Sequence, residues 1–166
     1  IYEDYKGYED PLRKHHTSSV TRDIWMYVPS IDPSEGFRID GNGTFTKLTS
    51  FNGEDRNPVF ELGGNAYYYL SEQDGTLNIY YTDSLADQLF NGGSIKSKQI
   101  TFYKGNPVRY LSISHNGTLC YSYDGELYTI KSGGQPEKVN IRIVTDQIEK
   151  ESEIQTLTSG ATRMAI

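Results

Sequence analysis

Lys47-Leu48-Thr49-Ser50-Phe51 is followed by Arg56-Asn57-Pro58-Val59-Phe60, and this pair of segments decides the fold because its pattern returns later in the chain. The second copy is Gln99-Ile100-Thr101-Phe102-Tyr103, followed by Asn106-Pro107-Val108-Arg109-Tyr110. The leading segments are offset by 52 residues and the Asn-Pro-Val segments by 49. A period near 50 residues indicates a repeat architecture, in which each unit packs on its neighbours.

Both copies continue into the same kinds of turn. Gly64-Asn65 and Asn116-Gly117 each precede an alternating strand, and Asp74-Gly75 and Asp124-Gly125 each precede the strand after it. Asn-Gly and Asp-Gly pairs supply the positive φ angles that two-residue hairpins require. We therefore predict units of four short antiparallel strands, each strand pairing with its neighbours in sequence.

The predicted fold class is all-β, with four-stranded meanders that form the blades of a partial β-propeller. The chain has 14 Tyr and 6 Phe in 166 residues, and aromatic side chains favour strands. Hydrophobic residues make up only 36%, so we expect much of each sheet to face solvent or a polar channel. A unit of 40 to 50 residues with four strands is typical of a propeller blade. A β-sandwich stays open as an alternative, because regularly spaced short strands fit it too.

Three regions are expected along the chain. Residues 1–143 form about three blades, of which the first is incomplete. Residues 144–153 are acidic and polar and form a linker or a connection between propellers. Residues 154–166 begin a further blade or a second propeller. Because the chain lacks a start methionine and ends in a strand-like segment, we expect both ends to be cuts within a longer protein.

The first and last blades are interpreted from fragments of the repeat. Arg22 to Tyr27 matches the third strand of a blade whose earlier strands lie upstream, and Phe45 to Phe51 supplies its outer strand. Val139 to Ile143 closes the last blade. Propellers need about four to eight blades to close, so about three blades leave unpaired faces. We expect those faces to meet the rest of a parent chain or a second copy of this chain, as a homo-oligomer.

Charge and composition exclude several partners. The net charge of −6 is opposite to that of a nucleic-acid-binding surface, so nucleic acid is excluded. No apolar stretch approaches the roughly 20 residues of a membrane span, and the start has no signal-peptide pattern. Cys120 is the single cysteine and is expected to be a small buried residue in a strand. The sequence alone leaves the compartment unknown.

Several segments, taken in order, resemble the propeller region of tricorn-like serine proteases of bacteria. A charged loop there leads into an Asp-Ile-Trp strand, and the next blade junction and two hairpins follow at similar positions. Together the matching segments cover roughly two thirds of the chain. They are residues 13–25, Leu48-Thr49, Gly53-Glu54-Asp55-Arg56-Asn57-Pro58-Val59, residues 69–75 with Asn78-Ile79-Tyr80, Gly117-Thr118-Leu119-Cys120-Tyr121, and residues 123–128.

The resemblance implies two stacked propellers ahead of a protease core that contains a PDZ-like domain and the catalytic serine, and that core lies outside this sequence. In such proteins the propellers guide or gate peptides on their way to and from the active site. The parent protein would be a serine peptidase, and therefore a hydrolase, in the periplasm or cytoplasm of a bacterium. Two alternatives stay open: a protein-interaction propeller of the Tol-Pal type, and the propeller of a prolyl-oligopeptidase-like enzyme.

A charged loop near the start is the best candidate for a contact surface, because loops on a rigid scaffold often carry binding residues. The expected partners are peptide substrates and the remaining domains of the parent chain. A loop that only packs on a neighbouring domain is an equally good interpretation. The candidate contact residues are Arg13, Lys14, His15, His16 and Arg22.

No catalytic residue, metal site or cofactor is expected within the chain itself. The sequence has no Gly-x-Ser-x-Gly elbow around a serine. His15, His16 and His115 lack the spacing of a recognised metal site. Asp40 begins a segment like a calcium loop, but Phe51 stands where that loop needs glutamate, so a turn is expected. The Asn-Gly-Thr sequons are also interpreted as turns.

Overall fold

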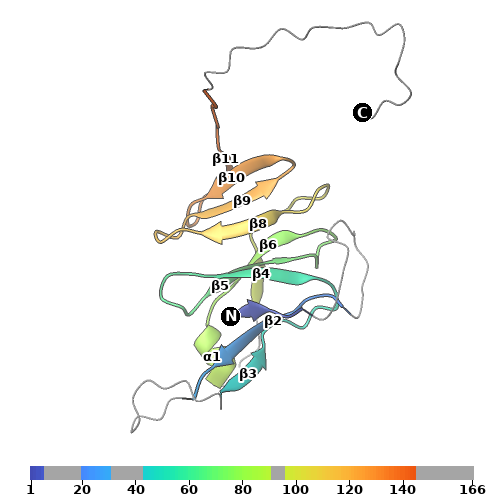
Figure 1. Ribbon diagram of the computed structural model, residues 1–166, viewed down its shortest axis with the longest axis vertical. Helices are drawn as coiled ribbons and strands as arrows, with labels where there is room; N and C mark the ends of the chain where they lie inside the picture. The colour runs from blue at the N-terminus through green and yellow to red at the C-terminus, as the bar shows by residue number, and fades with distance from the viewer. Residues whose placement is uncertain (6–19, 31–42, 91–95, 145–166) are drawn as a thin grey trace, which may run out of the picture.

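The computed structural model describes residues 1–5, 20–30, 43–90 and 96–144. Apart from one short helix, this part of the chain forms three antiparallel sheets, stacked in sequence order (Figure 1). The first sheet contains β1 (Tyr2–Glu3), β2 (Ile24–Val28) and β3 (Thr44–Lys47). The middle sheet contains β4 (Asp55–Phe60), β5 (Tyr67–Ser71), β6 (Asn78–Thr82) and β7 (Ser97–Gln99), with α1 (Leu85–Phe90) between β6 and β7. The last sheet contains β8 (Arg109–Ile113), β9 (Leu119–Tyr123), β10 (Glu126–Ile130) and β11 (Glu137–Lys138).

The all-β class and the meander are confirmed. In the middle and last sheets the strands pair in the order in which they occur along the chain. The hairpin between β9 and β10 has positive φ angles at Asp124 (51°) and Gly125 (78°), as a two-residue turn of the mirror-image type requires. Gly75 and Gly117 also have positive φ. The helix in the described part is too short to cross a membrane.

Two strands differ from expectation. Tyr2–Glu3 pairs with β2, so one earlier strand of the first sheet lies within the chain and not upstream of it. Two residues without a turn signal leave no pattern that could predict this strand. The last sheet closes with Glu137–Lys138 and not with Val139 to Ile143. The N–H of Val139 still donates to the carbonyl of Leu127, but the chain then leaves the sheet and residues 141–144 are exposed.

The expected linker over 144–153 and the expected further strands over 154–166 lie outside the described residues, apart from Val144. So do residues 40–42 of the segment interpreted as a turn. The Asn116-Gly117 sequon does form the turn between β8 and β9.

The leading segments of the repeat have the offset that the sequence indicates. The N–H of Leu48 donates to the carbonyl of Ile24, and the N–H of Ile24 donates to the hydroxyl of Thr49 at 3.0 Å. Ile100, Ile79 and Thr101 repeat both bonds, the second at 2.8 Å. In each copy the threonine hydroxyl replaces a backbone carbonyl where the outer strand leaves the sheet. The 52-residue offset is therefore a structural equivalence.

The Asn-Pro-Val segments, in contrast, are not equivalent. Both β4 and β8 carry a bulge, at residues 57–58 in β4 and 110–111 in β8. Asn57 (φ 52°) therefore corresponds to Tyr110 (φ 55°), and Asn106 lies in the loop before β8. The structural offset here is 53 residues, from Asn57 to Tyr110, whereas the tripeptides are 49 apart, so aligning the tripeptides shifts the second half of the repeat by four residues.

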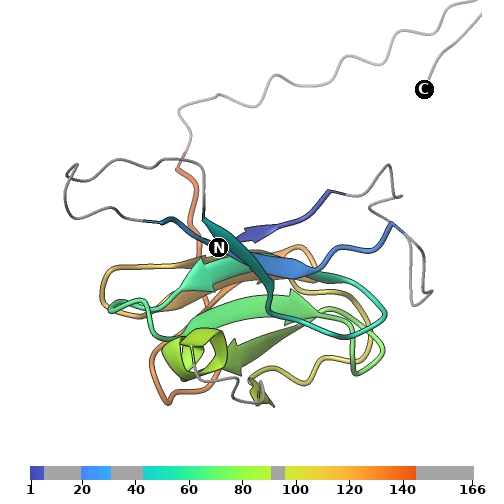
Figure 2. The same ribbon diagram turned by 90° about the horizontal axis from the view of Figure 1, so that it is seen from below.

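The middle sheet is covered on both faces, which differs from the expected one-sided sheets. Tyr67, Tyr69 and Tyr80 form a core with Ile24 and Leu48 of the first sheet. The opposite face of the same strands contributes Leu70, Leu77 and Ile79 to a second core, whose members from the last sheet are Val108, Leu111, Leu119, Tyr121 and Ile130. Seen from below, the sheets lie one behind another (Figure 2). A simple sandwich has one core between two sheets, whereas this stack has two cores among three.

Cys120 is half-buried and not fully buried as expected. It lies on β9 and pairs with Thr129, on the face of the last sheet that points away from the middle sheet. No described sheet covers that face, so the thiol keeps some contact with solvent.

Candidate functional site at the junction of the three sheets

The structure places only one of the predicted contact residues. Arg13, Lys14, His15 and His16 lie outside the described residues. Arg22 lies two residues before β2, where the first sheet meets the middle one. The site is therefore defined by the groups that Arg22 contacts.

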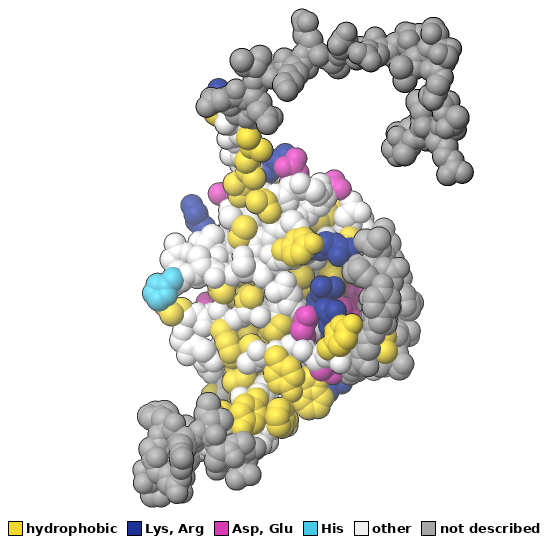
Figure 3. Space-filling model, viewed as in Figure 1, with side chains coloured by type: hydrophobic (Ala, Val, Ile, Leu, Met, Phe, Trp, Pro, Cys, Tyr) yellow, Lys and Arg dark blue, Asp and Glu magenta, His cyan; other side chains and the backbone are white. Residues whose placement is uncertain are grey.

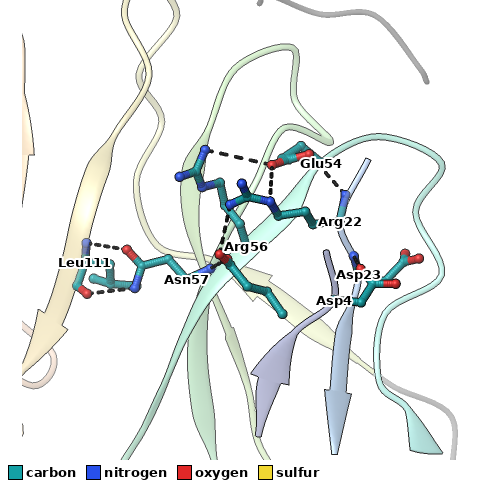
Figure 4. Close-up of polar contacts among 8 residues, drawn as sticks. Asp4, Arg22, Asp23, Glu54, Arg56, Asn57 and Leu111 are labelled. Atoms are coloured by element: carbon teal, nitrogen blue, oxygen red, sulfur yellow. Dashed lines mark hydrogen bonds and ion pairs between the residues drawn. The ribbon is translucent and has the colours of Figure 1, made fainter. Parts of the chain in front are cut away.

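Arg22 joins two carboxylates from different sheets (Figure 4). Its Nη1 lies 2.8 Å from Glu3 Oε1 in β1, and its Nε lies 3.8 Å from Glu54 Oε1, just before β4. Its backbone N–H donates to Glu54 Oε2 at 3.1 Å. The guanidinium carbon also lies 5.6 Å from the centre of the Tyr5 ring. Arg22 therefore cross-links the first and middle sheets, and its contact with substrate stays a prediction.

Asn57 extends the network to the last sheet (Figure 4). Its backbone N–H donates to Glu3 Oε2 at 2.6 Å. Its side-chain amide makes a reciprocal pair with the backbone of Leu111 in β8, donating to the carbonyl at 2.9 Å and accepting from the N–H at 3.0 Å. Asparagine tolerates the left-handed conformation found here better than most residues. One residue at the bulge of β4 thus contacts both neighbouring sheets.

Glu54 is the carboxylate that both arginines of this junction approach. Arg56 Nη1 lies 3.8 Å from Glu54 Oε1, so Glu54 is shared between two arginines. Glu54 is buried, and its N–H donates to Glu72 Oε1 at 3.0 Å. The network joins two guanidinium groups with the carboxylates of Glu3, Glu54 and Glu72 across the boundary between the sheets, and removal of both arginines would leave the buried Glu54 charge without these partners. This arrangement is a clamp between sheets and contains no activated nucleophile.

Asp55 lies beside this junction and is fully buried. Its N–H donates to the carbonyl of Arg22 at 3.0 Å, but neither carboxylate oxygen has a hydrogen bond of ordinary geometry. Burial raises its pKa to about 7, although the hydroxyl groups of Ser71 and Thr49 lie close enough to lower it. The charges of Asp23 and Glu54 raise it further. The carboxyl group therefore holds its proton to near-neutral pH.

The Tyr67 hydroxyl and Thr82 Oγ1 belong to the same core between the first and middle sheets. Like the Asp55 carboxylate, they are buried without a hydrogen bond of ordinary geometry. Burial raises the pKa of Tyr67, so this phenol stays protonated. These groups add polarity to a core that is otherwise closed by tyrosine and leucine side chains.

Sequence reasoning missed Glu3, Glu54, Asp55 and Asn57 as members of a common site. Asn57 attracted notice only as part of a repeated tripeptide, and the acidic residues looked like ordinary loop charges. A usable signal was present: an aspartate in the position equivalent to Val108, at the start of a buried strand, is unusual unless it has a function or a partner.

In the part of the chain that the structure describes, no group of three or more His, Cys, Asp or Glu side chains could hold a metal ion. His115 is exposed in the turn between β8 and β9. His15 and His16 lie outside this part, so the structure does not test them.

The described residues thus form a stack of antiparallel β-sheets, and a comparison with solved structures finds a similar fold. No family model and no curated protein matches the sequence. Solved structures do match, and one is the crystal structure of the tricorn protease, with a TM-score of 0.58 over 85% of this chain at 20% identity. The chain spans 12% of the length of that protein. At this identity the similarity shows a shared fold, and the fold is that of one part of the tricorn protease.

Proposed function

We propose that this chain is a non-catalytic β-propeller segment of a tricorn-like peptidase, which guides or gates peptides to a catalytic core outside the chain. The observation that carries the proposal is the structural similarity of 85% of the chain to part of the tricorn protease. The three sheets are then consecutive blades, with β4 and β8 as innermost strands.

The contacts between sheets support this interpretation. Each sheet buries one face on the next, and the same threonine bond and the same bulge recur at equivalent positions. The side-chain amide of Asn57 on β4 links to the backbone of Leu111 on β8, which holds the proposed innermost strands together. Repetition of one interface along a stack is what a propeller requires.

The first test is peptidase activity. The purified 166-residue chain should not cleave an unstructured fluorogenic peptide, whereas the longer parent protein should cleave it. Cleavage by the chain alone that is abolished by replacing one of its own serines would overturn the proposal. A parent protein without a PDZ-like domain and a serine peptidase core would overturn it as well.

An interaction scaffold is the second candidate, favoured by the outer face of the first sheet. Tyr2 and Phe45 are 39% and 60% exposed there, and the Phe45 ring lies 4.8 Å from that of Tyr27. Figure 3 shows hydrophobic side chains gathered over this lower end of the stack. Exposed aromatic patches commonly mark contact sites between proteins. The peptidase assay on the parent protein separates the two candidates.

A further inference from the structure

A groove of about 750 Å³ opens between the middle and last sheets. One wall is the end of the middle sheet, and the other is formed by the β8–β9 and β10–β11 turns. The lining includes the aromatic side chains of Tyr68, Tyr81 and Phe102 and the lysine side chains of Lys98 and Lys131. This volume is within the range of pockets that bind small molecules or a few peptide residues.

The groove lies between the middle and last sheets because no described helix packs there, as α1 does between the first and middle sheets. Between the first and middle sheets, α1 follows β6 and places Leu85 and Leu89 in the core with Met26 and Phe60. In the last sheet the equivalent connection, residues 131–136 after β10, contains no helix. Its turn lines the groove without filling it. The helix that packs at the first boundary therefore has no described counterpart at the second, where the groove lies.

A row of paired side chains forms the wall on the middle sheet. Tyr68 pairs across the strands with Tyr81, and Tyr81 pairs with Lys98 on β7. The two tyrosine rings lie 4.8 Å apart. Among the described strands β7 is the edge of its sheet, and an edge strand offers its outer backbone groups to an added strand. Phe102, which is 68% exposed, adds an apolar surface beyond this edge.

The groove collects positive charge in an acidic chain. Lys96, Lys98 and Lys131 line it, and none of the three forms an ion pair with a described residue. Two acidic residues, Glu61 and Asp83, also line the groove, so its lining has one more lysine than acidic side chains. Glu61 accepts a hydrogen bond from the Tyr81 hydroxyl at 3.3 Å. The whole chain has a net charge of −6, so unpaired lysines gathered beside aromatic rings favour an acidic ligand with an apolar part.

We propose that this groove binds an extended acidic peptide, whose backbone adds to the edge of β7. Its carboxylates then meet Lys98 and Lys131, and an apolar side chain on the same face of the added strand, two residues from a carboxylate, packs on Tyr81 and Phe102. The inference rests on the proposed peptide-guiding function and narrows it to a class of peptide. Because the lysines are exposed, binding should weaken as salt increases.

The experiment measures fluorescence anisotropy of a short fluorescein-labelled peptide in the presence of the full 166-residue chain. In this peptide glutamate and leucine take turns at every second position, with serine between them, so that both side chains lie on one face of the strand. The test variant is Lys98→Gln with Lys131→Gln. The matched control is Lys104→Gln with Lys138→Gln, which removes the same charge from lysines outside the groove that pair with Asp74 and Glu126. A second control peptide carries glutamine in place of glutamate.

We expect the test variant to bind the acidic peptide about tenfold more weakly than the unaltered chain, which corresponds to roughly 1.4 kcal/mol. The control variant should differ by less than about twofold. Three outcomes would contradict the proposed peptide site. They are an equal loss of affinity in both variants, equal affinity for the glutamine peptide, and no binding of the acidic peptide up to about 1 mM. If the groove binds as expected but the parent protein has no peptidase activity, the proposed function fails and the peptide site stands.

Discussion

Asp55 is a carboxyl group that the fold buries at a junction of charges. Its pKa of about 7 in the folded chain lies above the ordinary value of 3.8, so between these values the folded state holds a proton that the unfolded state has lost. Below about pH 4 the raised pKa makes its full contribution to the free energy of unfolding. That contribution is lost as the pH rises through about 7. Stability should therefore fall across that range.

Asp55→Asn removes this dependence. The amide keeps the shape of the side chain without a charge, so the variant should gain stability relative to the unaltered chain at pH 8, on the order of 4 kcal/mol at most. Urea unfolding at pH 5 and pH 8 measures the difference. Asp124→Asn, in an exposed turn, serves as the control and should leave the pH dependence unchanged. A variant whose stability falls with pH as steeply as that of the unaltered chain would show that another group is responsible.

Thr101 tests the repeated hydrogen bond. Thr101→Val keeps the shape and the β-branch but leaves the buried N–H of Ile79 without its acceptor. The expected loss in the free energy of unfolding is about 1–3 kcal/mol. Thr44→Val, on the exposed start of β3, is the matched control and should change stability by less than about 0.5 kcal/mol. A similar loss in the free energy of unfolding for both substitutions would show that the hydrogen bond of the Thr101 hydroxyl does not stabilise the fold.

At the scale of the elements, the bulge of β4 connects conformation with contact between sheets. Asn57→Gly accepts the positive φ but loses the amide pair with Leu111, whereas Asn57→Ala loses the pair and also strains the backbone. We expect the free energy of unfolding to be highest for the unaltered chain, lower for the glycine variant and lowest for the alanine variant. The alanine variant should lie about 1–2 kcal/mol below the glycine variant. Denaturant unfolding of the three proteins checks the order. An alanine variant as stable as the glycine variant would mean that the left-handed conformation is not held there.

The elements differ in how far sequence could predict them. The hairpins were predictable because Asp-Gly and Asn-Gly carry their conformation locally. The equivalence of Thr49 and Thr101 was predictable because each follows an aliphatic residue at the same place in the repeated segment. The bulges at Asn57 and Tyr110 were not, because different residue types occupy them and contacts with neighbouring sheets stabilise the first. Two-residue β1 and six-residue α1 are too short for a periodic pattern.

The candidate site was predictable only in part. Arg22 stood out as a charge beside a strand, but its partners Glu3 and Glu54 lie 19 and 32 residues away and come together only through sheet stacking. The groove between the middle and last sheets depends on the absence of a helix between β10 and β11. No sequence pattern predicts that absence. Long-range packing therefore decides both sites.

At the scale of the whole molecule, the two outer faces of the stack have different chemistry. The first sheet exposes Tyr2 and Phe45, while the last sheet exposes part of Leu127 beside the half-buried Cys120. We predict that the chain self-associates through the aromatic face. Light scattering should show an average mass that rises with concentration, and Phe45→Ser should reduce the rise. A monomer at every concentration would contradict this prediction.

The most direct measurement is an experimental structure of this chain within the longer protein proposed above. We predict that the three sheets are consecutive around one axis, with β4 and β8 nearest to that axis and another sheet packed on Tyr2 and Phe45. A structure in which the face with Tyr2 and Phe45 stays in solvent, or in which the sheets close into a sandwich with no common axis, would contradict it.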